Sequence, residues 1–598
     1  MRKIRRLSAL ILSGILLFFA TSCTISVETE GERFQKFLEN EFITAMESDY
    51  VTSHVYLQEP ENYNIDESKI EVRLGARFDD TSLKESGNAA ETAYKTFQKF
   101  TREFLTEEQK DLYDLYEYQQ SLAVKLNDEK FSYYTPLFQS MTGLHYQLPT
   151  LLADWEVRNE QDVQDLILLV KDSKPYIDSA LAYTKKQQEK GLLMLDLQSI
   201  IDYCDSILEK GENSSILTSM YTNIDTLGLS EEKTESYRKQ LKEAFQTSFI
   251  PAYQAIRDTM ENLQSGQNNQ FGLEKFENGK EYYELLLQQS IGSHKSVEEI
   301  REMMTQAYNN HLINLTDVML SSPEDIQPLI TGQLPETGYN SYEEILNDIQ
   351  DKMLQDFPKV SHLEYNIMDI NEEIASSSGI AAYFNIPALD GTSPKQLRVN
   401  PLTGEISSIT TFFTVSHEGF PGHMYQYAYM YENTDSNYAK AMSNVSAYTE
   451  GYAVYAQYSS AQYLEGINEN LLTAYIENEL ATYAVIILAD IGIHYDGWSL
   501  QEFTDFLTQK GFILDEENAE IQYRQLQANP AAFQSYYVGY EEIAAMKESA
   551  MKELGENFSE KGFNKALLKS GAAPFNVVEK NITAYIKESS STFGKKVA

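Results

Sequence analysis

Helical periodicity runs through almost all of this 598-residue chain, and it limits the folds that the chain can adopt. Glycine (29 residues) and proline (15 residues) are scarce, so few positions interrupt a helix. Between Glu32 and Asp49, apolar residues recur three or four positions apart, which is the spacing of one buried helical face. Ser296, with Glu299 three positions later, is a capping-box pattern for a helix that runs through Val318. We therefore expect a mainly α protein.

Strand signals are confined to one region of the chain. Ile380–Asn385 and Gln396–Asn400 are short runs that contain β-branched and aromatic residues, and Pro387 and Gly391 lie between them. They predict a hairpin or a small β-sheet. This sheet would lie just before the most unusual motif of the chain, so we expect it beside the helix that carries the motif.

A polar loop at Gln264–Gln270 is the best candidate for a domain boundary. It would separate an N-terminal helical lobe, residues 31–265, from a C-terminal lobe, residues 271–598. The same pattern also allows residues 31–598 to form one domain with two lobes around a deep cleft. We expect the protein to be a monomer.

The first 23 residues have the organisation of a bacterial export signal. Basic residues precede an apolar stretch, Leu7–Phe19, that is too short to serve comfortably as a permanent membrane anchor. Ala20–Cys23 looks like a lipobox, in which cleavage before Cys23 leaves a lipidated N-terminus. We predict a signal peptide over residues 1–22, lipidation of Cys23, a tether over residues 23–30 and an extracytoplasmic protein anchored to the bacterial cell membrane. An ordinary secretory signal is the alternative.

The composition of the chain limits the partners that the protein can bind. No other stretch approaches about 18 uninterrupted apolar residues, so the lipid is expected to be the only membrane attachment of a soluble body. A formal charge of −42, from 90 acidic against 48 basic residues, excludes nucleic acid as a partner because its phosphates would be repelled. Cys204, the only other cysteine, is expected to be a small buried hydrophobe.

The run from His417 to His423, H-E-G-F-P-G-H, combines two imidazoles with a carboxylate. The zinc-hydrolase pattern H-E-x-x-H has its histidines four apart on one helical face. Here they are six apart, and six steps of about 100° turn the second roughly 240° away from the first. Pro421 and Gly422 can break the helix between them. We predict that both histidines bind one zinc ion across this break, with Glu418 as the general base.

A catalytic zinc site needs a further protein ligand and one open position. Glu450 is our candidate, because it interrupts the apolar and aromatic run Ala447–Ala456, where a buried carboxylate would require a cation. Glu432 and Asp435 are alternatives within a polar run that is typical of a loop.

Two further kinds of side chain could stabilise an oxyanion. His494 ends a run of small and apolar residues and could donate to a substrate carbonyl, although a structural histidine is the alternative. Tyr536, Tyr537 and Tyr540 offer phenol hydroxyl groups that could assist a metal ion in polarising a carbonyl.

The two central motifs resemble those of a large bacterial family long classified as a domain of unknown function. Its members carry H-E-G-x-P-G-H and E-G-W-A-x-Y-A, which correspond here to His417–His423 and Glu450–Ala456. Tyr452 and Met424 stand where members often have tryptophan and histidine. The members look like distant relatives of the gluzincin peptidases, including carboxypeptidase Taq, oligopeptidase F and angiotensin-converting enzyme.

The resemblance covers most of the mature chain and implies a zincin-like, gluzincin-type fold with a deep cleft. It also implies a zinc peptidase site with these members: zinc ligands His417, His423 and Glu450, the general base Glu418, and the transition-state donors His494 and Tyr536.

Our leading hypothesis is a lipid-anchored, extracytoplasmic zinc metallopeptidase with one zinc ion and a peptide substrate. Two alternatives remain open. One is a helical surface lipoprotein that binds peptides or wall fragments with little or no turnover. The other is a zinc hydrolase that acts on a non-peptide amide or ester.

Overall fold

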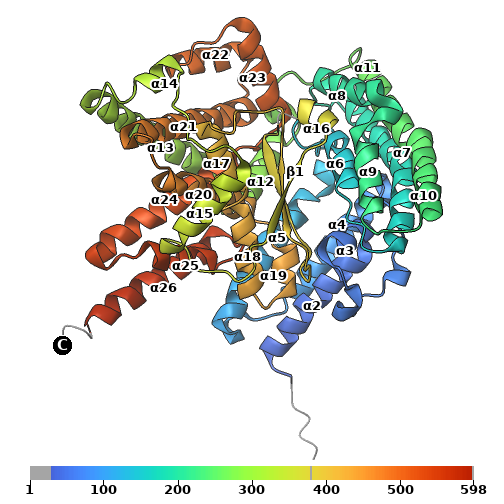
Figure 1. Ribbon diagram of the computed structural model, residues 1–598, viewed down its shortest axis with the longest axis horizontal. Helices are drawn as coiled ribbons and strands as arrows, with labels where there is room; N and C mark the ends of the chain where they lie inside the picture. The colour runs from blue at the N-terminus through green and yellow to red at the C-terminus, as the bar shows by residue number, and fades with distance from the viewer. Residues whose placement is uncertain (1–27, 378–379, 595–598) are drawn as a thin grey trace, which may run out of the picture.

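The computed structural model describes residues 28–377 and 380–594. The predicted signal peptide, residues 1–22, and the predicted lipidation site, Cys23, lie outside the described residues. The described chain is mainly helical, as predicted, with one small β-sheet (Figure 1).

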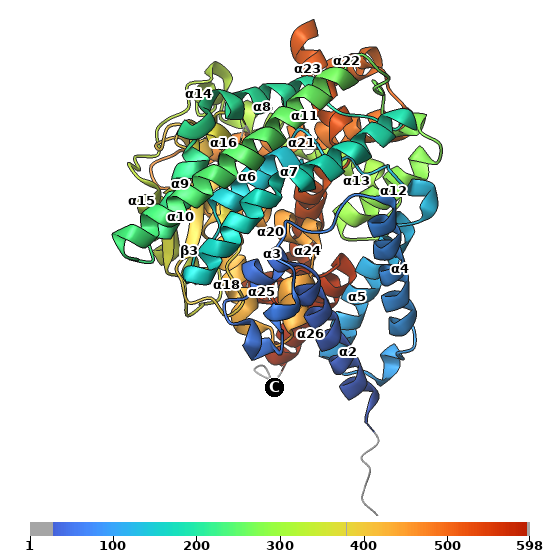
Figure 2. The same ribbon diagram turned by 90° about the vertical axis from the view of Figure 1, so that its right-hand side faces the viewer.

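Helices of the N-terminal half begin at capping residues that the sequence supplies. Thr29 and Glu32 form a capping box at the start of the first described helix, which confirms the helix predicted over Glu32–Asp49. Figure 2 faces the layer formed by α7–α11. The helices of this half are α2 (Glu30–Ser48), α3 (Tyr50–Tyr56), α4 (Asp80–Phe97), α5 (Glu107–Leu126), α6 (Leu144–Ala153), α7 (Glu160–Glu189), α8 (Leu197–Lys210), α9 (Ser215–Asp225), α10 (Glu231–Ala244) and α11 (Ile250–Leu263).

Helices of the C-terminal half carry the two central motifs of the sequence, His417–His423 and Glu450–Ala456. Ser296 and Glu299 form the predicted capping box, and the helix that they begin ends at Ser321. The helices are α12 (Gly279–Ile291), α13 (Val297–Ser321), α14 (Gln327–Thr331), α15 (Tyr342–Lys352), α16 (Glu372–Ser377), α17 (Ile409–Glu418), α18 (His423–Asn433), α19 (Asn437–Met442), α20 (Ser446–Ser459), α21 (Glu469–Ile491), α22 (Leu500–Gln509), α23 (Glu516–Ala528), α24 (Gln534–Leu554), α25 (Glu560–Leu568) and α26 (Phe575–Gly594).

The β-sheet has the strand order β1-β3-β2. Strand β3 (Lys395–Val399) pairs in parallel with β1 (Tyr365–Asp369) and antiparallel with β2 (Ala382–Asn385). Both predicted strands are therefore confirmed, and β1 is an addition to them. Strand β2 lies at an edge, and it contacts the motif helix α17.

The hydrophobic core crosses the predicted boundary between the two halves. One contiguous set of buried apolar side chains extends from Phe34 to Ile582. Helix α2 packs against α19, and α5 packs against both α12 and α26. Gln264–Gln270 is a connection between α11 and the next helical turn, as predicted. These contacts join the helices on either side of Gln264–Gln270 within the described residues, and the division into one or two domains stays a prediction.

One helix of the described chain is long and apolar enough to span a membrane by length and composition alone. It covers Glu469–Asp496, that is, α21 and the π-helical turn η10 (Gly492–Asp496) after it. Half of its most apolar window is buried inside the protein, and α21 packs along α13. We therefore interpret it as a core helix of a folded body.

Cys204 lies on α8 and is fully buried, as expected for a small hydrophobe. It is a free cysteine, and burial raises the pKa of its thiol far above the usual range. Its position therefore points to a packing role.

Candidate metal centre

The motif helix breaks where the sequence predicts. Helix α17 ends at Glu418, and α18 begins at His423, so the four residues between them form a connector. The Phe420–Pro421 peptide bond in this connector is cis. A Cβ atom on Gly422 would lie 1.8 Å from the carbonyl oxygen of His417, so only glycine fits this close approach.

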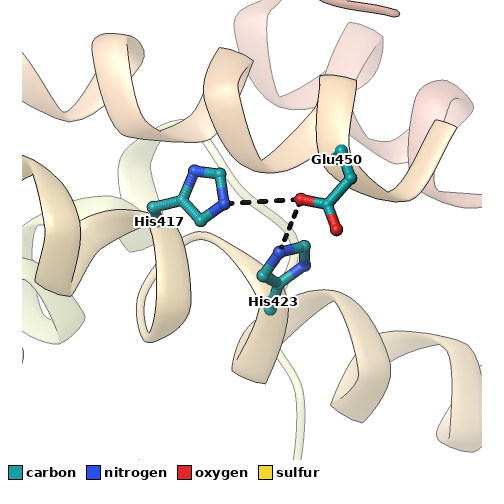
Figure 3. Close-up of side chains that lie close together, drawn as sticks. All are labelled: His417, His423 and Glu450. Carbon is teal, nitrogen blue, oxygen red and sulfur yellow. Dashed lines mark ion pairs between the residues drawn. The ribbon is translucent and has the colours of Figure 1, made fainter. Parts of the chain in front are cut away.

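The break brings both histidines to one point, where Glu450 of α20 meets them (Figure 3). Nε2 of His423 lies 3.3 Å from Oε2 of Glu450, and Nε2 of His417 lies 3.6 Å from the same oxygen. Ligand atoms from the three residues all lie within 4.8 Å of one another. Two ligands of a tetrahedral zinc ion are about 3.3 Å apart when each bond is about 2.0–2.1 Å. The observed spacing therefore suits one small metal ion.

The electrostatics of the cluster favour a cation between its members. Oε2 of Glu450 is buried, and its contacts are the ion pairs with His423 and His417. Burial raises the pKa of this carboxyl, but the Coulombic effect of His423 and the contacts with both histidines outweigh it and lower the pKa. Burial alone would lower the pKa of His423, but the facing Glu450 outweighs it and raises this pKa to about 9. In the metal-free protein, a proton on His423 supplies the positive charge that a metal ion would otherwise supply.

Two glutamines orient the histidines. Nδ1 of His417 lies 3.0 Å from Oε1 of Gln457, and Nδ1 of His423 lies 3.3 Å from Oε1 of Gln426. Because a glutamine carbonyl can only accept, each Nδ1 carries the hydrogen. Each Nε2 is therefore available to bind a metal ion, and such partners of a ligating imidazole fix its tautomer and direction.

Glu418 lies beside the three-residue cluster without joining it. Its Oε1 is 4.0 Å from Nε2 of His417, and its Oε2 accepts the backbone N–H of Phe384 on strand β2 at 3.0 Å. Burial raises the pKa of this carboxyl, while His423 and His417 act in the opposite direction. This is the placement expected of a proton acceptor near the centre.

Tyr536 is the tyrosine that faces the centre. Its ring is stacked on that of His417 at 6.2 Å between centroids. Burial raises the pKa of its phenol far above the usual range, and Glu450 and Glu418 act in the same direction. Tyr537 instead stacks on Tyr483, at 3.6 Å between ring centroids, and Tyr540 lies edge-on to Tyr458.

Close helix packing brings Tyr536 of α24 near Glu450 of α20. A Cβ atom on Gly451 would lie 2.4 Å from the backbone of Gly539, and one on Gly539 would lie 2.1 Å from the carbonyl oxygen of Ala447. Two glycines therefore let the backbones of the two helices touch.

The structure assigns His494 to a different place. It is fully buried in η10, where its Nδ1 accepts the backbone N–H of Leu273 at 3.3 Å and its Nε2 donates to the carbonyl oxygen of Leu526 at 3.1 Å. A neutral imidazole has one N–H, and this one is already used. The predicted role of His494 as a transition-state donor is therefore corrected to a structural one.

The alternative ligands also lie apart from the centre. Glu432 accepts the backbone N–H groups of Ser361 and His362, at 2.7 and 3.0 Å. Asp435 lines a surface pocket between α5, α18, α19 and the loop that follows α25. Neither belongs to the cluster of described residues that could hold a metal ion.

Four contributors were missed from the sequence: Gln426, Gln457, Phe384 and Gly539. Two of them could have been found from helical spacing. Gln457 lies seven residues after Glu450 and Gln426 lies three residues after His423, and both spacings return to the same face of a helix. The backbone N–H of Phe384 carries no such signal, since every strand residue except proline has one.

A protein-family model for bacterial proteins of unknown function, DUF885, matches residues 70–582. The chain belongs to this family. No curated protein matches it. Membership of the DUF885 family shows what this chain is related to, but it does not assign an activity. Any functional proposal therefore depends on the residues of the site.

Two solved structures are similar to this DUF885 protein along most of its length. One, described as a putative lipoprotein from Colwellia psychrerythraea, has a TM-score of 0.77 at 17% identity and covers 94% of this chain and 100% of its own. The other, described as a putative lipoprotein of unknown function from Shewanella oneidensis, has a TM-score of 0.61 at 13% identity and covers 91% and 98%. At these identities, the likeness shows a shared fold.

Proposed function

We propose that this protein is a zinc-dependent metallopeptidase. The observation that carries the proposal is the convergence of His417, His423 and Glu450 across a broken helix, with Glu418 beside them. Two histidines from one motif and a glutamate from a following helix form the ligand set of a gluzincin, which supports the resemblance that the sequence suggests.

The donor set fits a zinc ion. Two imidazole nitrogens and a carboxylate are ligands that zinc accepts, and three protein ligands leave a position open. The buried Oε2 of Glu450 faces both histidines and is the atom best placed to meet such a cation. The side chains of His417 and Glu450 keep 12% and 24% of their surface exposed, so a small molecule can reach the centre.

The chemistry divides between the metal ion and the chain. When bound, zinc supplies a Lewis acid that polarises a carbonyl group and lowers the pKa of water. Glu418 accepts the proton of the attacking water and passes it to the leaving amine. The hydroxyl of Tyr536 donates to the oxygen on which negative charge develops. His417 and His423 stay oriented through Gln457 and Gln426.

Strand β2 offers a place for an extended peptide. The hydrogen bond from Asn400 N to the carbonyl oxygen of Ala381 sets the antiparallel ladder with β3. Because hydrogen-bonded and non-hydrogen-bonded pairs alternate, the backbone groups of Ala382 and Phe384 face the outer edge of the sheet. Glu418 already accepts the N–H of Phe384, so the carbonyl group of Phe384 and both backbone groups of Ala382 are left for a peptide. A peptide that adds to this edge would lie beside Glu418, which is why a peptide is the favoured substrate.

We further propose that the protein acts outside the cytoplasm, held to the membrane by a lipid on Cys23. The lipobox-like sequence supports this placement. The description of both structural neighbours as lipoproteins supports it as well.

Cleavage of a mixed peptide library by metal-loaded protein tests the activity. We expect the wild type to cleave peptides and Glu418→Gln to lose cleavage while keeping its zinc. The exposed Glu405→Gln is the matched control and should behave as wild type. Full activity of the Glu418→Gln protein would exclude Glu418 as the general base.

A further inference from the structure

Helix α21 presents a glutamate between two tyrosines. Tyr475, Glu479 and Tyr483 are four residues apart, so they lie on one face of the helix, and all three are partly exposed. Phe413 of α17 stacks on Tyr475 at 5.8 Å between ring centroids, and Tyr537 of α24 stacks on Tyr483 at 3.6 Å. Both tyrosines that flank Glu479 are therefore held in place by a ring from another helix.

Tyr458 of α20 adds a third tyrosine beside this carboxylate. Its ring lies edge-on to Phe413 at 5.6 Å between centroids. Burial raises the pKa of its phenol, and Glu479 causes the largest further increase, ahead of Tyr483 and Tyr475. We call Tyr458, Tyr475, Glu479 and Tyr483 the Glu479 cluster.

Glu479 has no counterion in the described part of the chain. It forms no hydrogen bond or ion pair there, and burial raises the pKa of its carboxyl. Helices α17, α20 and α21 contain no lysine or arginine. Arg301 and His311 of α13 and Lys547 of α24 each pair with other acidic side chains. A partly buried carboxylate without a cation is unfavourable, which suits this position to a positively charged ligand.

The Glu479 cluster adjoins the candidate metal centre. Helices α17, α20, α21 and α24 lie together in the C-terminal half (Figure 1). Tyr458 directly follows Gln457, whose Oε1 lies 3.0 Å from Nδ1 of His417. Phe413, which packs on two members of the cluster, lies one helical turn before His417 on α17.

An accessible face of α17 joins the two places. It runs from His417 through Thr414 to Thr410, whose hydroxyl oxygen lies 3.2 Å from that of Tyr475. These seven steps of helix span about 10 Å, which is the length of about three residues of extended peptide. A peptide bound at the metal centre can therefore bring a nearby side chain to Glu479.

We propose that the Glu479 cluster binds an organic cation, either an alkylammonium or a guanidinium group. Tyrosine ring faces attract such cations, and the apolar stem of the ligand packs on the same rings. A metal ion is a poorer match, because a single carboxylate provides too few ligands. Glu479 is also outside the group of described residues that could hold a metal ion.

The cation has a specific source if the protein is a peptidase. It is then the side chain of a lysine or arginine within about three residues of the cleaved bond, and Glu479 determines specificity. This step rests on the proposed function. The binding of an organic cation does not, because the Glu479 cluster contains no ligand of the metal centre.

The binding test uses the full-length, metal-free protein, so that its outcome is independent of peptidase activity. Calorimetric titration compares N-acetyl-arginine methylamide with N-acetyl-citrulline methylamide, which has nearly the same shape and no charge. We expect wild type to bind the arginine probe at least about tenfold more tightly, the effect of one charge-assisted contact. Glu479→Gln should lose this difference, whereas Glu469→Gln, at an exposed position of the same helix, should keep it. Equal affinities of wild type for the two probes, or a difference that survives in Glu479→Gln, would overturn the proposal.

A third probe, n-butylguanidinium, identifies the source of the cation. An affinity equal to that of the arginine probe indicates a free organic cation, and tighter binding of the arginine probe indicates a peptide.

Cleavage by zinc-loaded protein tests the role in specificity. Matched peptides carry arginine or citrulline at each of the three positions on either side of the cleaved bond. We expect the ratio of kcat/KM for the arginine and citrulline peptides to reach about 10 to 100 at one position and to fall to near one in Glu479→Gln. Cleavage without a charge preference at any position would contradict this role. Failure to cleave every peptide, with the arginine probe still bound through Glu479, would contradict the peptidase and leave the cation site in place.

Discussion

The backbone N–H of Phe384 donates to Oε2 of Glu418 at 3.0 Å and so ties the edge strand of the sheet to the proposed general base. The side chain of Glu418 is largely buried, and this amide holds one of its oxygens while the other lies near His417. The strand and the motif helix therefore form one unit, in which β2 fixes the direction of the carboxylate.

Replacing Phe384 with proline removes the N–H but keeps the backbone of an edge strand, where proline is tolerated. We expect kcat for peptide cleavage to fall roughly ten- to 100-fold, the effect of losing one hydrogen bond to a charged group, with zinc content unchanged. Phe384→Ala keeps the N–H and should retain much more activity. Equal losses in the two variants would show that the side chain, and not the amide, matters.

Tyr536→Phe removes the hydroxyl group that faces the centre and keeps the ring on His417. We expect kcat to fall about 100- to 1,000-fold, as for other oxyanion donors, with little change in KM or in zinc affinity. Tyr537→Phe is the matched control, because that ring packs on Tyr483 and should keep its stacking. A Tyr536→Phe enzyme as active as the control would exclude this donor.

Gln457→Leu removes the acceptor for the Nδ1 hydrogen of His417. We expect zinc affinity, measured by competition with a chelator, to fall about 10- to 100-fold because the imidazole loses its fixed tautomer and direction. Gln462→Leu, an exposed position after the same helix, should leave affinity unchanged. Unaltered affinity in Gln457→Leu would mean that packing alone orients His417.

His311 gives the fold a pH dependence away from the metal centre. Its Nδ1 lies 2.7 Å from Glu477 of α21, and its Nε2 lies 2.7 Å from Glu541 of α24. Burial alone would lower the pKa of His311, but the two carboxylates raise it to about 9. Protonated His311 therefore joins three helices through two charged contacts.

The stabilisation by His311 is fully present below the ordinary histidine pKa, about 6.5, and is lost as pH rises through about 9, because the folded state holds this proton more tightly than the unfolded chain. It amounts to on the order of 3 kcal/mol. The free energies of unfolding of wild type and His311→Gln, measured with denaturant, should differ most near pH 6 and converge near pH 10. A difference that is constant with pH would contradict this assignment.

The sequence predicts most of this architecture, because helical spacing and capping residues are local signals. The helix break at Pro421 and Gly422 was predictable, since two histidines six apart cannot share a face. Strand β1 was not, because Tyr365–Asp369 is short and contains Asn366 and Asp369, which are uncommon in strands. Its pairing with β3 depends on tertiary contacts.

The site shows the same division between local and tertiary information. Glu450 was predictable as an acidic residue in an apolar run, whereas the choice of Tyr536 over its neighbours depends on how α24 packs on α20. The sequence placed His494 in the wrong role, because local sequence does not distinguish a buried histidine with two backbone partners from a histidine that lies near a substrate. Only the packing of Leu273 and Leu526 around it distinguishes them.

Anomalous diffraction at the zinc edge, from crystals of wild-type protein grown with zinc, tests the central claim most directly. The account predicts one peak, about 2.0–2.2 Å from Nε2 of His417, Nε2 of His423 and a carboxylate oxygen of Glu450, with a non-protein ligand in the remaining position. A centre without a peak, or a zinc ion closed by a fourth protein ligand, would contradict it.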